Sequence, residues 1–246
     1  MQYFKYFIVL FFIPIGLMGQ KADKIIKKPL LRYEKSIGLS FNSDGWGVGY
    51  SVGKAISYKN KKTWDFNFSF IGDSKQERQL WISSSSSAKS FFYGKLMHFY
   101  SLQIMRGRQK VIAEKPYWGG VEVRWFYYGG LNLGIGKPIY LYVFDQTINN
   151  TITLEKYDPQ KHMIEDIFGR GPYTKGLSEI SLYPGMSFKL GLNVEFGPYQ
   201  ENTKAFEAGV IVDAYALPIQ IMGLNDPEYL KLRLFLTFRF GSRYNK

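Results

Sequence analysis

Apolar and polar residues alternate along most of the chain. In the stretch KLRLFLTFRF, from Lys231 to Phe240, leucine or phenylalanine occupies every second position, and arginine, threonine or lysine fills most positions between. Successive side chains of a β-strand point to opposite faces, so this alternation predicts a strand with one apolar and one polar face. The same period recurs along the chain and predicts an all-β protein.

Eight segments carry this alternation, separated by turns or polar loops. Two of them are long, because the apolar positions keep their phase across Gly129-Gly130 and across Pro184-Gly185. A two-residue hairpin would reverse that phase, whereas a three-residue turn would preserve it, so eight strands are predicted and ten remain an alternative. The predicted strands span approximately residues 33–42, 46–58, 62–73, 94–107, 118–144, 177–197, 204–216 and 229–240.

The size of the apolar side chains indicates which side of the sheet faces water. A small soluble barrel has room for few bulky side chains inside. A membrane barrel turns them toward lipid and fills its lumen with polar residues. We therefore predict a closed, antiparallel, up-and-down transmembrane β-barrel, with a soluble β-sandwich as the alternative. The predicted lipid-facing residues are Trp64, Phe66, Phe68, Leu232, Leu234, Leu236, Phe238 and Phe240.

Charged residues on the polar face would point into the lumen of such a barrel. Charges in so narrow a space must pair to offset their loss of hydration. The sequence therefore predicts a plugged, salt-bridged interior and argues against an open diffusion pore. The predicted lumen charge network comprises Glu122, Arg124, Lys189, Glu195, Glu207, Asp213, Arg233 and Arg239.

The first twenty residues differ from the rest of the chain. The apolar run from Phe7 to Met18 is too short to cross a bilayer as a helix and is typical of a secretory signal peptide. Residues 1–20 are predicted to be a cleaved signal peptide and residues 21–246 a barrel domain in the bacterial outer membrane. An even number of strands would put both termini in the periplasm. The long loops predicted outside the cell are 74–93, 145–176 and 217–228.

The amino-acid composition excludes several kinds of site and partner. The chain has no cysteine, which excludes disulfides, cysteine-based metal sites and a lipid-anchored cysteine. Its formal net charge of +12 raises the question of nucleic acid, but the basic residues are scattered along the whole chain. We therefore expect cations that face solvent or lipid headgroups, and no nucleic-acid partner.

Only two histidines are present, which limits acid–base catalysis. His98 precedes Ser101 by three positions, whereas a base and a nucleophile on one face of a strand need a spacing of two. We therefore predict no catalytic residue and no cofactor.

The polar segment EKYDPQKHMIEDIFGRGPY lies in the longest predicted loop. Asp158 followed by Pro159 is a typical helix start, so one short helix ending near Phe168 is predicted within this loop. Asp158, His162 and Glu165 are weak candidates for metal ligands, because a helix would bring them together. Their spacing matches no specific zinc or calcium motif, and a solvated loop helix is the simpler interpretation.

Several stretches of the chain resemble a family of small outer-membrane β-barrel proteins from Bacteroidota. They are YGKLMHFYSLQIMRGRQ, GGVEVRWFYYGG, KPIYLYV, EKYDPQKH and FGRGPYTKG, within a resemblance that runs from about Gly47 to Phe240. The resemblance implies the fold and the location. The family has no settled activity, so no catalytic residue is carried over.

These features together predict a non-enzymatic structural or binding component of the outer membrane. The expected partners are outer-membrane lipid and lipopolysaccharide. Another envelope protein is a further candidate partner for the hairpin around residues 131–185. Two alternatives stay open, namely a lipid-modifying enzyme and a narrow channel.

Overall fold

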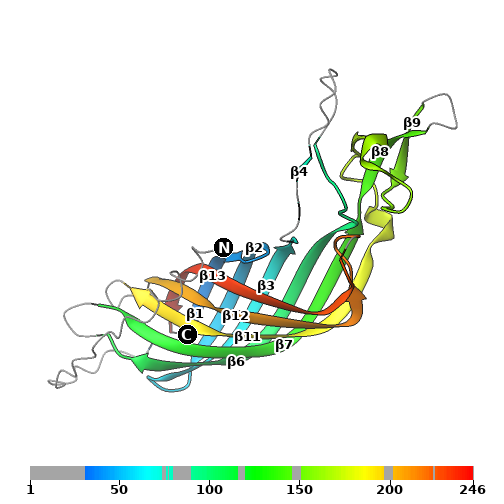
Figure 1. Ribbon diagram of the computed structural model, residues 1–246. Helices are drawn as coiled ribbons and strands as arrows, with labels where there is room; N and C mark the ends of the chain where they lie inside the picture. Colours follow the sequence, from blue (N-terminus) through cyan, green and yellow to red (C-terminus); the bar gives the residue numbers. More distant parts are fainter. Residues whose placement is uncertain are drawn as a thin grey trace, which may run out of the picture.

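Eight strands form one closed antiparallel barrel in the computed structural model of the protein (Figure 1). They are β1 (Tyr33–Asn42), β2 (Gly45–Ala55), β3 (Asn60–Ile71), β6 (Met97–Ala113), β7 (Glu122–Pro138), β11 (Ser181–Phe196), β12 (Asn202–Ile219) and β13 (Glu228–Tyr244). The signal peptide predicted over residues 1–20 lies outside the described residues. The structure describes residues 31–73, 76, 78–79, 90–115, 120–145, 151–196, 202–223 and 225–245.

Each barrel strand pairs with the next barrel strand along the chain, and β1 closes the ring on β13. At this closure Ile37 lies opposite Phe240. β7 runs through Gly129-Gly130 without a break, and β11 runs through Pro184-Gly185. The prediction of eight strands is therefore confirmed, and the ten-stranded alternative is wrong.

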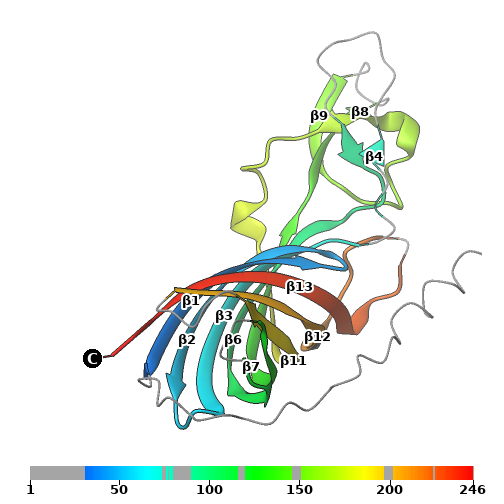
Figure 2. The same cartoon turned by 90° about the vertical axis from the view of Figure 1, so that its left-hand side faces the viewer.

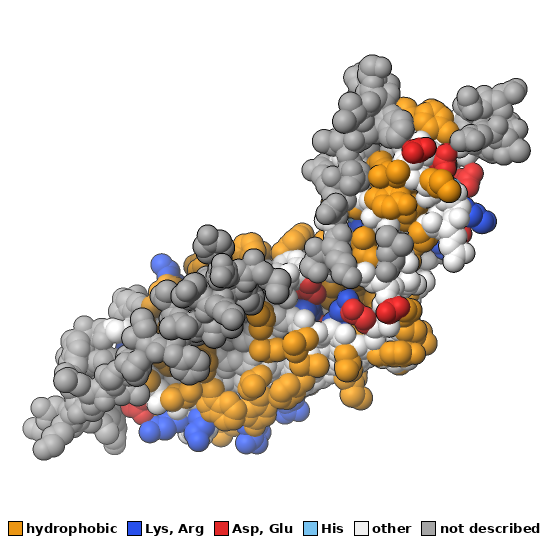
Figure 3. Space-filling view, in the orientation of Figure 1, with side chains coloured by type: hydrophobic (Ala, Val, Ile, Leu, Met, Phe, Trp, Pro, Cys, Tyr) orange, Lys and Arg blue, Asp and Glu red, His pale blue; other side chains and the backbone are white. Residues whose placement is uncertain are grey.

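The outer wall of the barrel is apolar and its inside is polar. Leu232 is 71% exposed, whereas the next residue, Arg233, is 0% exposed. All eight side chains predicted to face lipid are exposed on the outer wall. Figure 3 shows hydrophobic side chains along this wall. An apolar belt around a polar lumen is the arrangement of a membrane β-barrel.

The lumen is narrow, and glycine makes room on its wall. Gly47 of β2 lies opposite Ser40 of β1 on one side and opposite Ser69 of β3 on the other. A Cβ atom at Gly47 would lie 2.8 Å from the Ser69 hydroxyl oxygen and 2.9 Å from that of Ser40. This crowding explains the glycine-rich sequence of β2.

The described parts of the long loops lie at one end of the barrel, which we call the loop end. Both ends of the described chain lie at the other end, which we call the terminal end. Residues 90–96, 139–145 and 151–180 form a small structure at the loop end, which we call the platform (Figures 1 and 2). Its main sheet has three antiparallel strands in the order β10-β8-β9. The elements outside the barrel are β4 (Arg78–Gln79), β5 (Phe91–Phe92), β8 (Tyr140–Asp145), β9 (Thr151–Lys156), η3 (Ile164–Asp166), β10 (Ile167–Arg170) and η4 (Leu177–Glu179).

The two longest predicted strands are shorter than expected. The strand predicted over 118–144 ends at Pro138, and the chain then enters β8 in a different sheet. Leu141 and Val143 keep the apolar phase, but they pack inside the platform and do not face lipid. The strand predicted over 177–197 begins at β11, after the short turn η4.

The helix predicted from Asp158 to about Phe168 is wrong. The Asp158 carboxylate accepts a hydrogen bond from the Gln160 backbone N–H at 3.0 Å, which closes a local turn. Within this stretch the one helical element is the short turn η3, after which Ile167 pairs with Val143 of β8. Burial of Ile167 in the platform therefore outweighs the local helix-start signal. In the residues that the structure describes, no helix is long and apolar enough to cross a bilayer.

Candidate functional site

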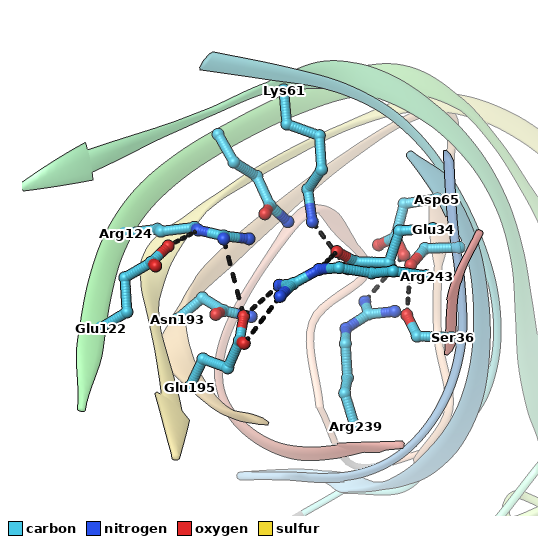
Figure 4. Close-up of polar contacts among 12 residues, drawn as sticks. Glu34, Ser36, Lys61, Asp65, Glu122, Arg124, Asn193, Glu195, Arg239 and Arg243 are labelled. Atoms are coloured by element: carbon cyan, nitrogen blue, oxygen red, sulfur yellow. Dashed lines mark hydrogen bonds and ion pairs between the residues drawn. The ribbon is translucent and has the colours of Figure 1, made fainter. Parts of the chain in front are cut away.

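Ion pairs fill the lumen near the terminal end (Figure 4). Arg243 lies between two acids: Nε donates to Glu34 Oε2 at 2.9 Å, and Nη1 donates to Glu195 Oε1 at 3.0 Å. Lys61 Nζ donates to Glu34 Oε1 at 2.7 Å. The Arg124 guanidinium lies 3.6 Å from Glu195. These contacts join strands that are far apart in sequence, so they brace the barrel from inside.

A second group of charges lies midway along the lumen. Arg239 Nη2 donates to Asp65 Oδ1 at 2.7 Å, and its Nε lies 2.7 Å from Glu207 Oε2. Lys189 Nζ lies 3.3 Å from Asp65 and 4.0 Å from Glu207. The Lys189 ammonium also lies 4.5 Å from the centroid of the Phe235 ring. Two cations therefore share two carboxylates, and all four side chains are buried.

A third group lies closer to the loop end. Asp213 accepts hydrogen bonds from Arg233, from Ser187 and from Gln103, the last at 2.7 Å. Beyond it an apolar cluster fills the mouth of the barrel, so the lumen changes from charged to apolar toward the platform. The buried members of this cluster are Ile71, Met97, Phe99, Tyr215, Ile219 and Ile221.

Charge inside the lumen is balanced. Burying ions is costly unless each has a partner, and here every buried acid has a basic partner. At the terminal end the lumen opens into a pocket of about 30 Å³, room for about one or two water molecules. The acids are Glu34, Asp65, Glu122, Glu195, Glu207 and Asp213, and the bases are Lys61, Arg124, Lys189, Arg233, Arg239 and Arg243.

All eight charged residues of the predicted lumen network lie buried inside the barrel. The sequence prediction omits four other charged residues of the lumen network, namely Glu34, Lys61, Asp65 and Arg243. Asp65 shares the inward phase of β3 with Asn67 and Ser69, so the alternation itself could have found it, whereas Lys61 lies one residue before the predicted start of that strand. Arg243 lies beyond the predicted end of the last strand, so the alternation there could not include it.

Main-chain hydrogen bonds join the platform to the loop between β12 and β13, and others tie its own segments together. Leu96 N–H donates to Ile221 C=O at 2.9 Å, Ile139 N–H to Leu96 C=O at 3.0 Å, and Tyr157 N–H to Ile139 C=O at 3.0 Å. Gly223 N–H donates to Gly94 C=O at 2.7 Å. An apolar cluster packs beneath these bonds, so the platform has a small hydrophobic core of its own. Its buried members are Phe91, Ile139, Leu141, Val143, Tyr157 and Ile167.

A groove of about 700 Å³ lies between the platform and the loop that joins β12 to β13. It is open to solvent, and its lining combines aromatic rings with hydrogen-bond donors and acceptors of both charges. Burial raises the pKa of the Tyr157 phenol, which accepts a hydrogen bond from the Gly94 N–H at 3.1 Å. Lining residues include Leu96, Tyr140, Glu155, Lys156, Lys161 and Gln220.

Of the weak metal candidates, Asp158 and His162 line this groove, whereas Glu165 lies outside it. His162 Nδ1 accepts the Asp158 backbone N–H at 3.2 Å, so its Nε2 carries the proton and faces Glu155 Oε2 at 3.2 Å. Both ring nitrogens are thus occupied within the chain, and Glu165 is exposed on η3. The described residues hold no group of three or more histidine, aspartate or glutamate side chains that could bind a metal.

His98 and Ser101 lie on opposite faces of β6, as their spacing predicts. His98 is on the outer side near the loop end, with its ring 5.7 Å from that of Tyr173. Ser101 is buried in the lumen, where its hydroxyl donates to Asn132 Oδ1 at 2.8 Å. The two side chains therefore do not form a base–nucleophile pair.

Comparison with known proteins gives distant structural similarity. No protein-family model matches the chain, and no curated protein matches it significantly. The crystal structure of Neisserial surface protein A aligns over 86% of this chain and 96% of its own, with 9% identity and a TM-score of 0.40. Ail, the attachment invasion locus protein of Yersinia pestis, covers 87% and 100% with 10% identity and a TM-score of 0.41. A major outer membrane protein from Thermus thermophilus covers 85% and 99% with 11% identity and a TM-score of 0.42. Values this low transfer no binding property or activity to the chain.

Proposed function

We propose that this protein is a small outer-membrane β-barrel that acts as a non-enzymatic binding component, with the platform groove as its binding surface. The main supporting observation is the main-chain hydrogen bonding between the platform and the loop that joins β12 to β13, which holds the two sides of the groove together. The apolar outer wall supports a membrane location, and closed barrels with this inside-out pattern are typical of bacterial outer membranes.

The filled lumen supports a binding role over transport. Charged side chains occupy its terminal and middle parts, and the apolar cluster occupies the mouth. An ion would have to separate several buried ion pairs to pass, which is costly in a low-dielectric interior. We expect the purified protein to produce no conductance steps in a planar lipid bilayer. Regular conductance steps would contradict a filled lumen and favour the narrow-channel alternative.

The groove suits a polar ligand such as a peptide or a saccharide. Lys156 and Lys161 offer donors, whereas Glu155 offers acceptors, and Tyr140 offers an aromatic face. Mixed polar and aromatic linings of this kind fix ligand orientation through a few directional contacts. We place the contact with a second envelope component, a protein or lipopolysaccharide, in this groove.

Site-specific photo-cross-linking in the native membrane tests the groove. A photoreactive residue replaces Gln160, which lines the groove and is exposed, and in a matched strain it replaces Lys175, which is exposed outside the groove. We expect one adduct that is specific to position 160 and disappears in the Lys161→Ala background. Adducts equal at both positions, or none at position 160, contradict the proposal.

A separate measurement tests the alternative that the protein is a lipid-modifying enzyme. Mass spectrometry of lipid A from a deletion strain is expected to match that of the parent strain. A missing or added acyl chain or phosphate would instead favour an enzyme.

A further inference from the structure

Seven cations lie on the outer wall of the barrel toward its terminal end. They come from five strands, and all are exposed. The lumen charges balance one another, so this exterior belt accounts for much of the chain's positive formal charge of +12. We call these residues the basic belt: Lys35, Lys54, Lys62, Arg106, Arg108, Lys110 and Lys204.

Three members of the basic belt lie in register on neighbouring strands. Lys54 of β2 is directly opposite Lys62 of β3, and Lys62 is directly opposite Arg108 of β6. Like charges opposite each other across a sheet repel and destabilise it. Neighbouring strands are about 4.8 Å apart, so the three cations span about 10 Å. A negative partner would therefore stabilise such a row.

The described part of the chain does not supply that partner. None of the seven cations forms an ion pair with a described acid. The exterior face of the eight strands carries one acid, Glu228, which lies at the loop end and pairs with Lys231. Near the terminal end the acid Glu114 pairs with Lys59, outside the belt. The row of three cations is therefore unneutralised within the described residues.

Aromatic residues place the basic belt at the edge of the apolar wall. Arg106 lies opposite Trp64, with its guanidinium carbon 5.0 Å from the ring centroid. Arg108 lies opposite Tyr127, and Lys110 lies opposite Trp125. Aromatic girdles of membrane barrels lie at the level of the lipid headgroups. The cations thus lie where phosphate groups of lipids would be.

We propose that the basic belt binds the headgroups of anionic glycerophospholipids in the leaflet at the terminal end of the barrel. Phosphate oxygens form charge-assisted hydrogen bonds with lysine and arginine, and they would neutralise the row at Lys54, Lys62 and Arg108. Lipopolysaccharide is the other phosphate-bearing lipid of an outer membrane, but it belongs to the leaflet on the side of the long loops. The inference rests on the proposed membrane location and adds a lipid partner for one leaflet.

Thermal unfolding in vesicles of defined composition tests the basic belt. The full chain is reconstituted in phosphatidylcholine alone, in phosphatidylcholine with phosphatidylglycerol, and in phosphatidylcholine with diphosphorylated lipid A. Heat-dependent gel migration reports the unfolding midpoint. We expect phosphatidylglycerol to raise the midpoint of the wild type, and added salt to reduce that rise because exposed charges are screened.

A row variant and a control variant isolate the contribution of the basic belt. Lys54→Gln/Lys62→Gln/Arg108→Gln is expected to lose most of the phosphatidylglycerol-dependent rise, since each cation near an anionic surface changes affinity roughly fivefold. In phosphatidylcholine it is expected to be at least as stable as the wild type, because the repulsion is gone. Arg170→Gln/Lys175→Gln removes two charges from exposed platform residues outside the groove and is expected to keep the full rise.

The outcomes separate this inference from the proposed function. A wild-type midpoint that is equal with and without phosphatidylglycerol overturns the basic belt as a lipid site, and so does a rise that occurs only with lipid A. If the variant that lacks Lys54, Lys62 and Arg108 does not fold, the salt dependence of the wild-type midpoint still tests the proposal. A midpoint rise that does not depend on salt would contradict charge pairing with the lipid. Failure of the wild type to insert into any vesicle overturns the membrane location and this inference together.

Discussion

The lumen and the platform both bury polar groups, but different interactions stabilise the two regions. In the lumen, charged side chains from strands far apart in sequence pair with one another, as Asp65 does with Arg239 and Lys189. In the platform, an apolar cluster and a few main-chain hydrogen bonds join the loops. A buried charge that loses its partner destabilises the whole barrel, whereas a platform contact can open locally. Damage to the lumen should therefore be global, and damage to the platform should stay local.

The largest effect is expected from Asp65→Asn in the lumen. Asp65 is 0% exposed and accepts from Arg239 and approaches Lys189, so its neutralisation leaves two buried cations sharing Glu207. We expect the free energy of unfolding to fall by about 3–5 kcal/mol. Urea unfolding in lipid vesicles, followed by tryptophan fluorescence, measures it. Asp226→Asn makes the same change at an exposed loop position and should alter stability by less than about 0.5 kcal/mol. Equal midpoints for the two variants would contradict the global role of the lumen network.

A smaller and local effect is expected from Ile167→Ala in the platform. Ile167 is 0% exposed within the apolar cluster, and truncation of a buried isoleucine costs about 2–5 kcal/mol. We expect faster proteolysis of the platform while the urea midpoint of the barrel stays unchanged. Ile164→Ala removes the same atoms three residues away from a side chain that is 40% exposed, and it should leave proteolysis unchanged. A lowered barrel midpoint in Ile167→Ala would show that the two regions unfold as one unit.

The barrel and its filled lumen follow from local signals in the sequence. Alternation fixes which residues of a strand face inward, so Glu207 and Asp213 could be assigned to the lumen without knowing their partners. The same phase turns Phe235 inward, but its residue type gives no sign of this, because Phe235 is one of three successive apolar residues. It packs inside the lumen, where the Lys189 ammonium lies over its ring.

The platform could not be predicted in the same way. Its strands pair residues distant in sequence, such as Val143 with Ile167, and no local pattern specifies that pairing. The Asp158-Pro159 pair signals a helix start, yet the next residues form a turn and a strand because burial of Ile167 decides the conformation. The groove arises from three loops meeting, which only the tertiary structure reveals.

A substitution at Gly223 is expected to weaken the contact between the platform and the loop that follows β12. A Cβ atom there would lie 2.5 Å from Pro159 Cγ and 3.2 Å from Pro159 Cβ. Gly223→Ala should therefore cost about 1–3 kcal/mol through overpacking, and we expect faster proteolysis of the platform. Gly129→Ala is the control, because its nearest neighbour, a Phe188 ring carbon, would lie at an ordinary 3.8 Å. Equal proteolysis of the two variants would mean that this loop contributes nothing to holding the platform.

The smallest expected effect is a pH dependence confined to the platform. Lys95 is buried between the rings of Phe70 and Phe92, and burial lowers the pKa of its ammonium from 10.5 to about 8, although the Asp73 carboxylate opposes this shift. Between these two values the unfolded platform binds a proton at Lys95 that the folded platform does not, so stability rises with pH. The cleavage rate of the platform should therefore fall as pH rises from 8 toward 10.5, by less than about tenfold per pH unit.

Lys95→Met separates this titration from other effects of pH, because it fills the same space without a proton to lose. Burial raises the pKa of the Tyr157 phenol, which moves its titration away from this window. The ratio of wild-type to Lys95→Met cleavage rates cancels the pH dependence of the protease itself. That ratio should fall with rising pH while the barrel midpoint changes equally in both proteins. A ratio that is flat across the window would mean that Lys95 titrates alike in the folded and unfolded platform, and a parallel change in the barrel midpoint would mean that the two regions are not independent.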